Sequence, residues 1–280
     1  APLPYLLHPL SASLIIPVFN EKDYIERCIE SVISSTEGIE NMELLLIDGG
    51  STDGTQEIIK KFVARYEFIK FFENEKKIIP TALNIGIRKS CGKCIVRLDA
   101  HAIYDIGYVN KCIKVLANSD KEVANVGGVI ETKPSGTSLF AKAIAYVLSS
   151  KLGVGNSTFR VSVPSASQFV ETVPFGCYRR EVFEEIGFFN ENEHRNEDIE
   201  FNKRLISSGK KILLDPEIKS SYFSRKDLNS FSKQQFNNGF IVTNKYRGKE
   251  SFHKLRHFVP LFFVLYLFCS LITLVLNISE

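Results

Sequence analysis

The chain has 280 residues, of which 44% are hydrophobic and 24% charged, so it can bury the core of one large domain and is neither disordered nor fibrous. Its formal net charge of +3 is small and its Lys and Arg residues are dispersed, which argues against a nucleic-acid partner. The six cysteines form no dense framework, so a disulfide scaffold is not expected.

Strands and helices alternate through the first half of the chain. Residues 1–12 are rich in proline and predict an irregular lead-in. Apolar strands are then predicted over residues 13–19, 43–48, 68–72 and 94–98, and helices over residues 21–33, 55–66, 80–89 and 108–116. This alternation indicates a parallel sheet with helices on both faces, and such sheets bind ligands at the carboxyl ends of their strands.

The pattern loosens in the second half, which we interpret as a substrate-facing elaboration of a nucleotide-binding first half. An amphipathic helix over residues 139–151 is expected either to pack on the core or to rest on a bilayer surface. The other predicted elements are strands over residues 123–131 and 211–214, a loop-rich stretch over 153–174, and helices over 181–186 and 197–208.

Residues 258–278 contain no charged side chain, and that length predicts a transmembrane helix. The preceding segment, 231–257, is basic towards its end and is expected to meet anionic lipid. By the positive-inside tendency, the large domain would face the cytoplasm at the inner membrane.

The run from Cys94 to Leu98 ends in Asp99 and His101, which are separated by one small residue. If the strand continues, these two side chains point to the same side and can converge on one cation. A carboxylate and an imidazole suit Mn²⁺, with Mg²⁺ as the alternative, and the cation would hold a phosphate. A lone histidine is otherwise more often a surface residue.

Polar residues also follow the first two strands. Asn20 and Glu21 end the first, and a glycine-rich loop containing Asp48 and Asp53 ends the second. The two aspartates are expected either to accept hydrogen bonds from a base or ribose, or to cap a turn and a helix. Arg97 would face the same cleft or form a structural ion pair, and the acidic pair at 197–198 by itself suits the first turn of a helix.

Five segments resemble glycosyltransferase family two, the inverting GT-A enzymes, in the order typical of that family. Additional segments, Gly-Val-Gly-Asn (153–156) and Val-Pro-Phe-Gly-Cys-Tyr-Arg-Arg (173–180), are similar to the bacterial succinoglycan-type glucosyltransferases. The five family segments are Ile-Pro-Val-Phe-Asn-Glu (16–21), Asp-Gly-Gly-Ser-Thr-Asp-Gly-Thr (48–55), Ala-Leu-Asn-Ile-Gly (82–86), Asp-Ala-His (99–101) and Asn-Glu-Asp (196–198).

The resemblance implies a GT-A domain over residues 13–230, with a Rossmann-like, mostly parallel mixed sheet flanked by helices. It implies that Asp48 contacts uracil, that Asp99 contacts the ribose or the metal, that His101 holds the metal bound to the diphosphate, and that Asp198 is the catalytic base. It also implies that Arg179 and Arg180 lie near the cleft, although an exposed ion pair was the simpler expectation. The residues expected to bind the nucleotide sugar are Pro17, Phe19, Asn20, Glu21, Asp48, Asp53, Asn84, Arg97, Asp99 and Glu197.

The expected reaction is the inverting transfer of one sugar, with glucose favoured, from a UDP-sugar to a lipid-linked saccharide during exopolysaccharide or cell-surface glycan synthesis. The chain has no Trp and lacks the Gln-x-x-Arg-Trp motif of processive members, so transfer should be non-processive. Two alternatives stay open, a polyprenyl-phosphate sugar synthase and an inactive sugar-nucleotide-binding or scaffold protein. The oligomeric state stays open as well.

Overall fold

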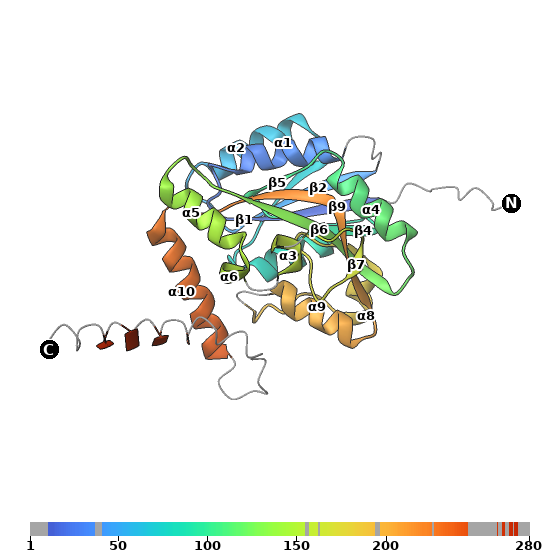
Figure 1. Ribbon diagram of the computed structural model, residues 1–280. Helices are drawn as coiled ribbons and strands as arrows, with labels where there is room; N and C mark the ends of the chain where they lie inside the picture. Colours follow the sequence, from blue (N-terminus) through green and yellow to red (C-terminus); the bar gives the residue numbers. More distant parts are fainter. Residues whose placement is uncertain are drawn as a thin grey trace. The chain divides into compact units, whose positions relative to one another are not determined.

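The computed structural model describes residues 11–36, 41–154, 157–161, 163–193, 197–225 and 227–245, together with residues 262, 265–266, 269–270 and 272–273. The chain divides into two compact units, Ala1–Phe231 and Ser232–Glu280. The first unit is an α/β fold built on one mixed sheet, and it holds the residues on which the predicted chemistry depends (Figure 1).

Within the described residues, the sheet has nine strands. Eight follow the order β3-β2-β1-β4-β8-β6-β9-β5, and β7 pairs with β9 beside this path. Strands β3, β2, β1 and β4 run parallel, whereas β8 is antiparallel to both β4 and β6. The strands are β1 (Ala12–Val18), β2 (Met42–Asp48), β3 (Ile69–Glu73), β4 (Cys94–Arg97), β5 (Ala102–Tyr104), β6 (Val123–Lys133), β7 (Gln168–Phe169), β8 (Cys177–Arg179) and β9 (Lys211–Phe223).

Helices cover both faces of the sheet, as the buried, β-branched strands require (Figure 1). Apolar side chains of α1, α2 and α4 pack on one face, and those of α3, α8 and α9 pack on the other. The helices are α1 (Ile25–Ser35), α2 (Thr55–Arg65), α3 (Ile79–Lys89), α4 (Tyr108–Asn118), α5 (Leu139–Leu148), α6 (Lys151–Val154), α7 (Thr158–Val161), α8 (Glu181–Ile186), α9 (Glu197–Ser207) and α10 (Leu228–Lys245).

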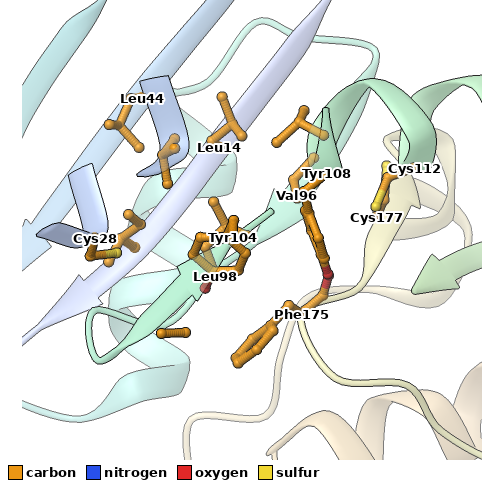
Figure 2. Close-up of a cluster of buried hydrophobic side chains, with 14 of the residues drawn as sticks. Leu14, Cys28, Leu44, Val96, Leu98, Tyr104, Tyr108, Cys112, Phe175 and Cys177 are labelled. Carbon is orange, nitrogen blue, oxygen red and sulfur yellow. The ribbon is translucent and has the colours of Figure 1, made fainter. Parts of the chain in front are cut away.

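One core cluster extends from the strands to the loop that follows β4. Figure 2 shows the rings of Tyr104, Tyr108 and Phe175 beside Leu98 in this cluster. The Tyr104 ring centre lies 5.0 Å from that of Tyr108 and 5.4 Å from that of Phe175, in edge-to-face arrangements that aromatic pairs favour. The aromatic core therefore fixes the ring of Tyr104, whose hydroxyl reaches the loop.

Helix α3 packs unusually close to β1 because Gly86 has no side chain. A Cβ atom at this position would clash with Cγ2 of Ile15. Gly86 and Asn84 belong to the Ala-Leu-Asn-Ile-Gly segment noted above, so part of that sequence pattern serves packing.

The structure adds elements that the sequence pattern did not predict. Strand β5 has only three residues, and β9 continues to Phe223 although its apolar pattern stops at Leu214. Residues 215–217 interrupt this apolar pattern at the point where the β6–β9 register shifts. They lie in an irregularity of the strand, after which β9 continues to pair with β6.

Most of the predicted transmembrane segment, 258–278, lies outside the described residues, as do residues 1–10 of the lead-in and residues 246–257 of the basic segment. Within the part of the chain that the structure describes, no helix has both the length and the apolar character needed to cross a membrane.

Candidate active site

The carboxyl ends of β2, β1 and β4 lie next to one another because these strands are adjacent and parallel. The predicted polar residues at 20–21, 48 and 99 therefore gather at one edge of the sheet. This confirms the arrangement expected from the order of strands and helices.

The loops after β1 and β2 are tied together by hydrogen bonds through Asn20. Its main-chain N–H donates to Oγ of Ser51 (2.8 Å), and its Oδ1 accepts from the N–H of Thr52 (2.9 Å). Asn20 has a φ of 55°, in the left-handed region that asparagine tolerates better than most residues. An asparagine at this position thus shapes the turn and joins the two loops.

Asp48 is fully buried, and its carboxylate organises its own loop. It accepts hydrogen bonds from the N–H groups of Gly50 and Ser51 (both 2.9 Å), from the Ser51 hydroxyl (2.5 Å) and from Nε2 of Gln56 (2.7 Å). These bonds use most of the acceptor capacity of a carboxylate. The turn-stabilising interpretation of Asp48 is therefore the one that the geometry supports, and its contact with uracil stays a prediction.

Asp53 likewise stabilises the turn that leads into α2, whose N-cap residue is Gly54. Its carboxylate accepts from the N–H and hydroxyl of Thr55 (3.1 and 2.6 Å) and from the N–H of Lys22 (3.1 Å). Desolvation raises the pKa of this carboxyl, but the hydrogen bonds from Thr55 and Lys22 outweigh it and leave the pKa below its ordinary value. Asp53 stays ionised and holds the loop in place.

Arg97, at the end of β4, lies close to three carboxylates. Its guanidinium lies 3.1 Å from Oε1 of Glu197, 3.3 Å from Oδ1 of Asp99 and 3.7 Å from Oδ2 of Asp198. The Arg97 side chain is 10% exposed and that of Glu197 is 5% exposed, whereas those of Asp99 and Asp198 are 25% and 27% exposed. Arg97 is thus both a buried ion-pair partner and a member of the site.

The electrostatics of this cluster follow from burial and charge. Desolvation lowers the pKa of Arg97, but Asp99, Glu197 and Asp198 outweigh it and raise the pKa above its ordinary value. Burial raises the pKa of Glu197, an effect that Arg97 opposes and Asp198 reinforces. The exposed partners, Asp99 and Asp198, are the carboxylates available to a ligand.

Asp99 is not in a strand, because β4 ends at Arg97 and residues 98–101 form a turn. The expectation that strand alternation aligns Asp99 with His101 was therefore wrong. Instead, the Tyr104 hydroxyl accepts from the N–H of Asp99 (2.7 Å) and donates to its carbonyl (3.1 Å), and the N–H of Ala102 donates to the same carbonyl (3.3 Å). The turn is held from the aromatic core, a role for Tyr104 that the sequence did not predict.

His101 is oriented by Glu21. The ring atom Nδ1 lies 3.1 Å from Oε1 of Glu21, so the neutral imidazole donates there and leaves Nε2 as an acceptor. Burial disfavours a charged ring, but the hydrogen bond to Glu21 and the charge of Asp99 outweigh it and raise the pKa of His101. Glu21 therefore lies against the predicted metal ligand.

The donor set fits a divalent cation with further ligands from a substrate. A metal-bound histidine usually donates the N–H of its other ring nitrogen to a carboxylate. Glu21 has the position of that carboxylate. Among the described residues, no group of three or more His, Cys, Asp or Glu side chains is arranged as a metal site. The chain would thus offer Asp99 and His101, and the remaining ligands would come from elsewhere.

Other predicted residues lie outside this cluster. Asn84 is buried, donates to the carbonyl of Phe189 (2.9 Å) and to Oε1 of Glu191 (3.0 Å), and accepts from the N–H of Phe189 (3.0 Å). These contacts hold the loop after α8, and a contact of Asn84 with the nucleotide stays a prediction. Pro17 lies half-buried in β1, whereas the Phe19 side chain is half exposed.

The expectation that Arg179 and Arg180 line the cleft was wrong. Arg179 donates to the carbonyls of Leu116 and Ser119 at the end of α4 and to that of Val123. Arg180 donates to the carbonyl of Gly92 and to the Ser90 hydroxyl. Both guanidiniums satisfy main-chain and hydroxyl oxygens of neighbouring elements, and neither forms the exposed ion pair that was the alternative.

Comparison with known proteins places these features in context. The family model described as "Glycosyl transferase family 2" matches residues 13–187. A dolichyl N-acetyl-alpha-D-glucosaminyl phosphate 3-beta-D-2,3-diacetamido-2,3-dideoxy-beta-D-glucuronosyltransferase of Methanococcus voltae is 33% identical over 233 residues, which span 81% of this chain and 71% of that protein. The succinoglycan biosynthesis protein ExoA of Rhizobium meliloti is 29% identical over 254 residues, 90% of this chain and 74% of that one.

Two solved structures share the fold. The mannosyltransferase PcManGT from Pyrobaculum calidifontis, in complex with GDP-Man and Mn²⁺, superposes with a TM-score of 0.62 at 17% identity, over 86% of this chain and 65% of that one. GalNAc-T7 with UDP, GalNAc and Mn²⁺ gives a TM-score of 0.61 at 17% identity, over 78% and 45% of the two chains. The predicted GT-A-like mixed sheet with flanking helices is confirmed.

Proposed function

The chain belongs to glycosyltransferase family 2, and from this membership and the site geometry we propose that it transfers one sugar, with inversion, from a UDP-sugar to a lipid-linked saccharide. The observation that carries the proposal is the cluster in which Arg97 brings Asp198 and Asp99 together at the carboxyl ends of the central strands. Glucose is the favoured sugar, because the segments at 153–156 and 173–180 resemble those of succinoglycan-type glucosyltransferases. The product would belong to an exopolysaccharide or another cell-surface glycan.

Asp198 would act as the catalytic base. Its carboxylate is partly exposed and lies 3.7 Å from Arg97, beyond a close ion pair, so it keeps acceptor capacity for a hydroxyl proton. As the acceptor oxygen bonds to the anomeric carbon from the face opposite UDP, Asp198 takes the hydroxyl proton and the bond to UDP breaks. A single displacement inverts the anomeric configuration.

Asp99 and His101 would hold the divalent cation, with Mn²⁺ favoured, and Glu21 would keep the His101 ring in the ligating orientation. When bound, such a cation stabilises the negative charge of the departing diphosphate. Solved structures of similar fold contain Mn²⁺ with a nucleotide or nucleotide sugar, which supports the choice of metal.

Replacing His101 with alanine should weaken metal-dependent UDP binding at least about tenfold, because one of two protein ligands is lost. Calorimetric titration of UDP with and without Mn²⁺ measures the effect, and metal-free binding should not change. The variant Glu200→Gln, which alters an acidic side chain paired with Arg204, serves as the control. Unchanged UDP affinity of His101→Ala at limiting and saturating Mn²⁺ would refute the ligand role.

Membrane association of the large unit is also part of the proposal. Helix α5 buries one side on β6 and exposes an apolar side, and Lys142 is the single charge in the helix. A helix that is apolar towards solvent, with a basic residue among its apolar side chains, suits the surface of an anionic bilayer. The strongly exposed apolar residues of α5 are Leu139, Phe140, Tyr146 and Val147. The inner-membrane location with a cytoplasmic catalytic domain stays a prediction.

The double variant Phe140→Asp/Tyr146→Asp should bind anionic phospholipid vesicles at least about tenfold more weakly, because two exposed aromatic side chains lose their burial in lipid. Co-sedimentation with vesicles measures this. The control is Ile106→Asp, because Ile106 is 78% exposed in the loop between β5 and α4. If Ile106→Asp weakens vesicle binding as much as the double variant does, the lipid-binding surface is not on α5.

A screen of UDP-sugars tests the function itself. The protein should release UDP from one UDP-sugar in the presence of Mn²⁺, and faster when a lipid extract supplies the acceptor. Release that depends on a polyprenyl phosphate alone would instead favour the polyprenyl-phosphate sugar synthase. Binding of UDP without hydrolysis or transfer of any UDP-sugar would favour the inactive binding protein.

A further inference from the structure

Two arginines near the end of β9 form no ion pair with a carboxylate of the described residues. Arg160 lies on α7, and Arg225 follows β9 directly after Ser224. None of the ion pairs among the described residues includes either of them. The other buried or half-buried guanidinium groups discussed above all donate to oxygen atoms at close range, so the half-buried Arg160 stands apart from them.

Arg160 is half-buried with most of its hydrogen-bonding capacity unused. Its only hydrogen bond among the described residues is a long one, 3.5 Å from Nη1 to Oγ1 of Thr132, whereas a guanidinium has five N–H donors. Burial lowers its pKa below the ordinary value, and the charge of Asp99 offsets part of this effect. A desolvated cation without a counter-ion is costly, and a bound anion would remove that cost.

The position of Arg160 relative to the metal ligands follows from strand pairing. Tyr222 on β9 is the register partner of both Ala102 on β5 and Thr132 on β6. The Arg160 guanidinium lies 5.1 Å from the Tyr222 ring centre, and the His101 ring lies 5.4 Å from the same ring at an angle of 70°. The cation and the imidazole therefore contact one aromatic side chain.

Arg225 lies close to the same strand end. It is exposed and follows Ser224, whose N–H donates to the carbonyl of Lys133, the residue after Thr132 on β6. Arg225 therefore comes three residues after Tyr222, whose ring contacts both Arg160 and His101.

We propose that Arg160 and Arg225 form an anion subsite that binds a phosphate or diphosphate group beside Asp99 and His101. The planar guanidinium suits bidentate recognition of phosphate oxygens. The identity of the ligand rests on the proposed function, because that reaction has a phosphate group on both substrates. The subsite binds either the diphosphate of the UDP-sugar or the phosphate of the lipid-linked acceptor.

The test uses inorganic pyrophosphate as the probe, titrated calorimetrically into the full chain without added metal, so that no metal bridges the contact. The variants are Arg160→Met, which keeps an unbranched stem on Tyr222, Arg160→Lys, which restores the charge, and Arg225→Ala. Arg65→Met is the control, because the guanidinium of Arg65 lies over Tyr66 at 5.1 Å at the end of α2. Thermal unfolding verifies that each variant folds.

Arg160→Met should weaken pyrophosphate binding about tenfold or more, Arg225→Ala should weaken it by a smaller factor, and Arg160→Lys should recover part of the loss. The control should bind like the wild type. Parallel titrations with UDP and with detergent-solubilised farnesyl diphosphate identify which substrate the subsite binds. A loss of affinity for UDP alone assigns the subsite to the diphosphate of the donor. A loss of affinity for farnesyl diphosphate alone assigns it to the phosphate of the acceptor.

The subsite is overturned if the wild type binds no pyrophosphate, or if Arg160→Met and Arg225→Ala bind all three ligands as the wild type does. Failure of the proposed function has a different signature. A wild type that releases UDP from no UDP-sugar, yet binds pyrophosphate in an Arg160-dependent manner, contradicts the reaction and retains the anion subsite.

Discussion

Replacing Asp198 with asparagine should reduce sugar transfer by a factor of about 100 to 10,000, the usual contribution of a general base. UDP binding should stay nearly intact, because Asp198 interacts with Arg97 only at 3.7 Å and the asparagine Oδ1 retains the hydrogen bond from the N–H of Ile199. Initial rates of UDP release with lipid-linked acceptor, combined with UDP titrations, separate the two effects.

The matched control is Glu200→Gln, which changes another acidic residue in the first turn of α9. Glu200 pairs with Arg204 at 2.8 Å, away from Arg97, and its loss should leave transfer close to the wild-type rate. An Asp198→Asn variant with wild-type turnover would remove Asp198 from the mechanism. It would also favour a polyprenyl phosphate as acceptor, because a phosphate oxygen needs no general base.

Replacing Arg97 with methionine should lower the free energy of unfolding by about 3–5 kcal/mol at neutral pH, because it leaves the buried Glu197 without its cation. Urea unfolding monitored by circular dichroism measures the change. The double variant Arg97→Met/Glu197→Gln should recover much of this stability, since it removes both charges. Equal destabilisation by the single and double variants would show that Arg97 acts through packing alone.

The stability loss of Arg97→Met should also depend on pH. Burial already raises the pKa of Glu197 while Arg97 opposes the increase, so removing Arg97 raises that pKa further. The folded variant then binds a proton that the unfolded chain releases, and its stability increases as the pH falls. The difference from the wild type should therefore be larger at about pH 8 than at about pH 5. A pH-independent difference would contradict the charge argument.

Much of the fold was predictable because its signals are local. The parallel strands β1, β2 and β4 are largely buried and rich in Leu, Ile and Val, and β3 contributes the apolar residues Ile69, Phe71 and Phe72. Helices α1 to α4 show helical periodicity between them. The antiparallel part was harder. Strands β5 and β8 have three residues each, too few for a periodic pattern, and β9 depends on pairing with β6 to continue through residues 215–217.

The candidate site was likewise predictable only in part. The gathering of Asn20, Asp48 and Asp99 follows from the parallel direction of β1, β2 and β4, which the sequence pattern predicted, and from their adjacency in the sheet, which it did not. The hydrogen bonds of the Asp48 carboxylate depend on the conformation of the loop that follows it. The orientations of Arg179 and Arg180 depend on oxygen atoms supplied by segments distant in sequence. Arg160 and Tyr222 carried no signal at all, since one falls in a loop-rich stretch and the other beyond the predicted end of its strand.

The hydrogen bonds of Tyr104 to the main chain of Asp99 link a proposed metal ligand to the interior of the protein. The same ring packs against Tyr108 and Phe175. Substitutions among these interior residues are therefore limited by more than the volume of the core. A substitution that preserves stability but tilts the Tyr104 ring would displace Asp99 and weaken the affinity for the cation. Metal titration should therefore detect such interior substitutions even where thermal unfolding shows no change in stability.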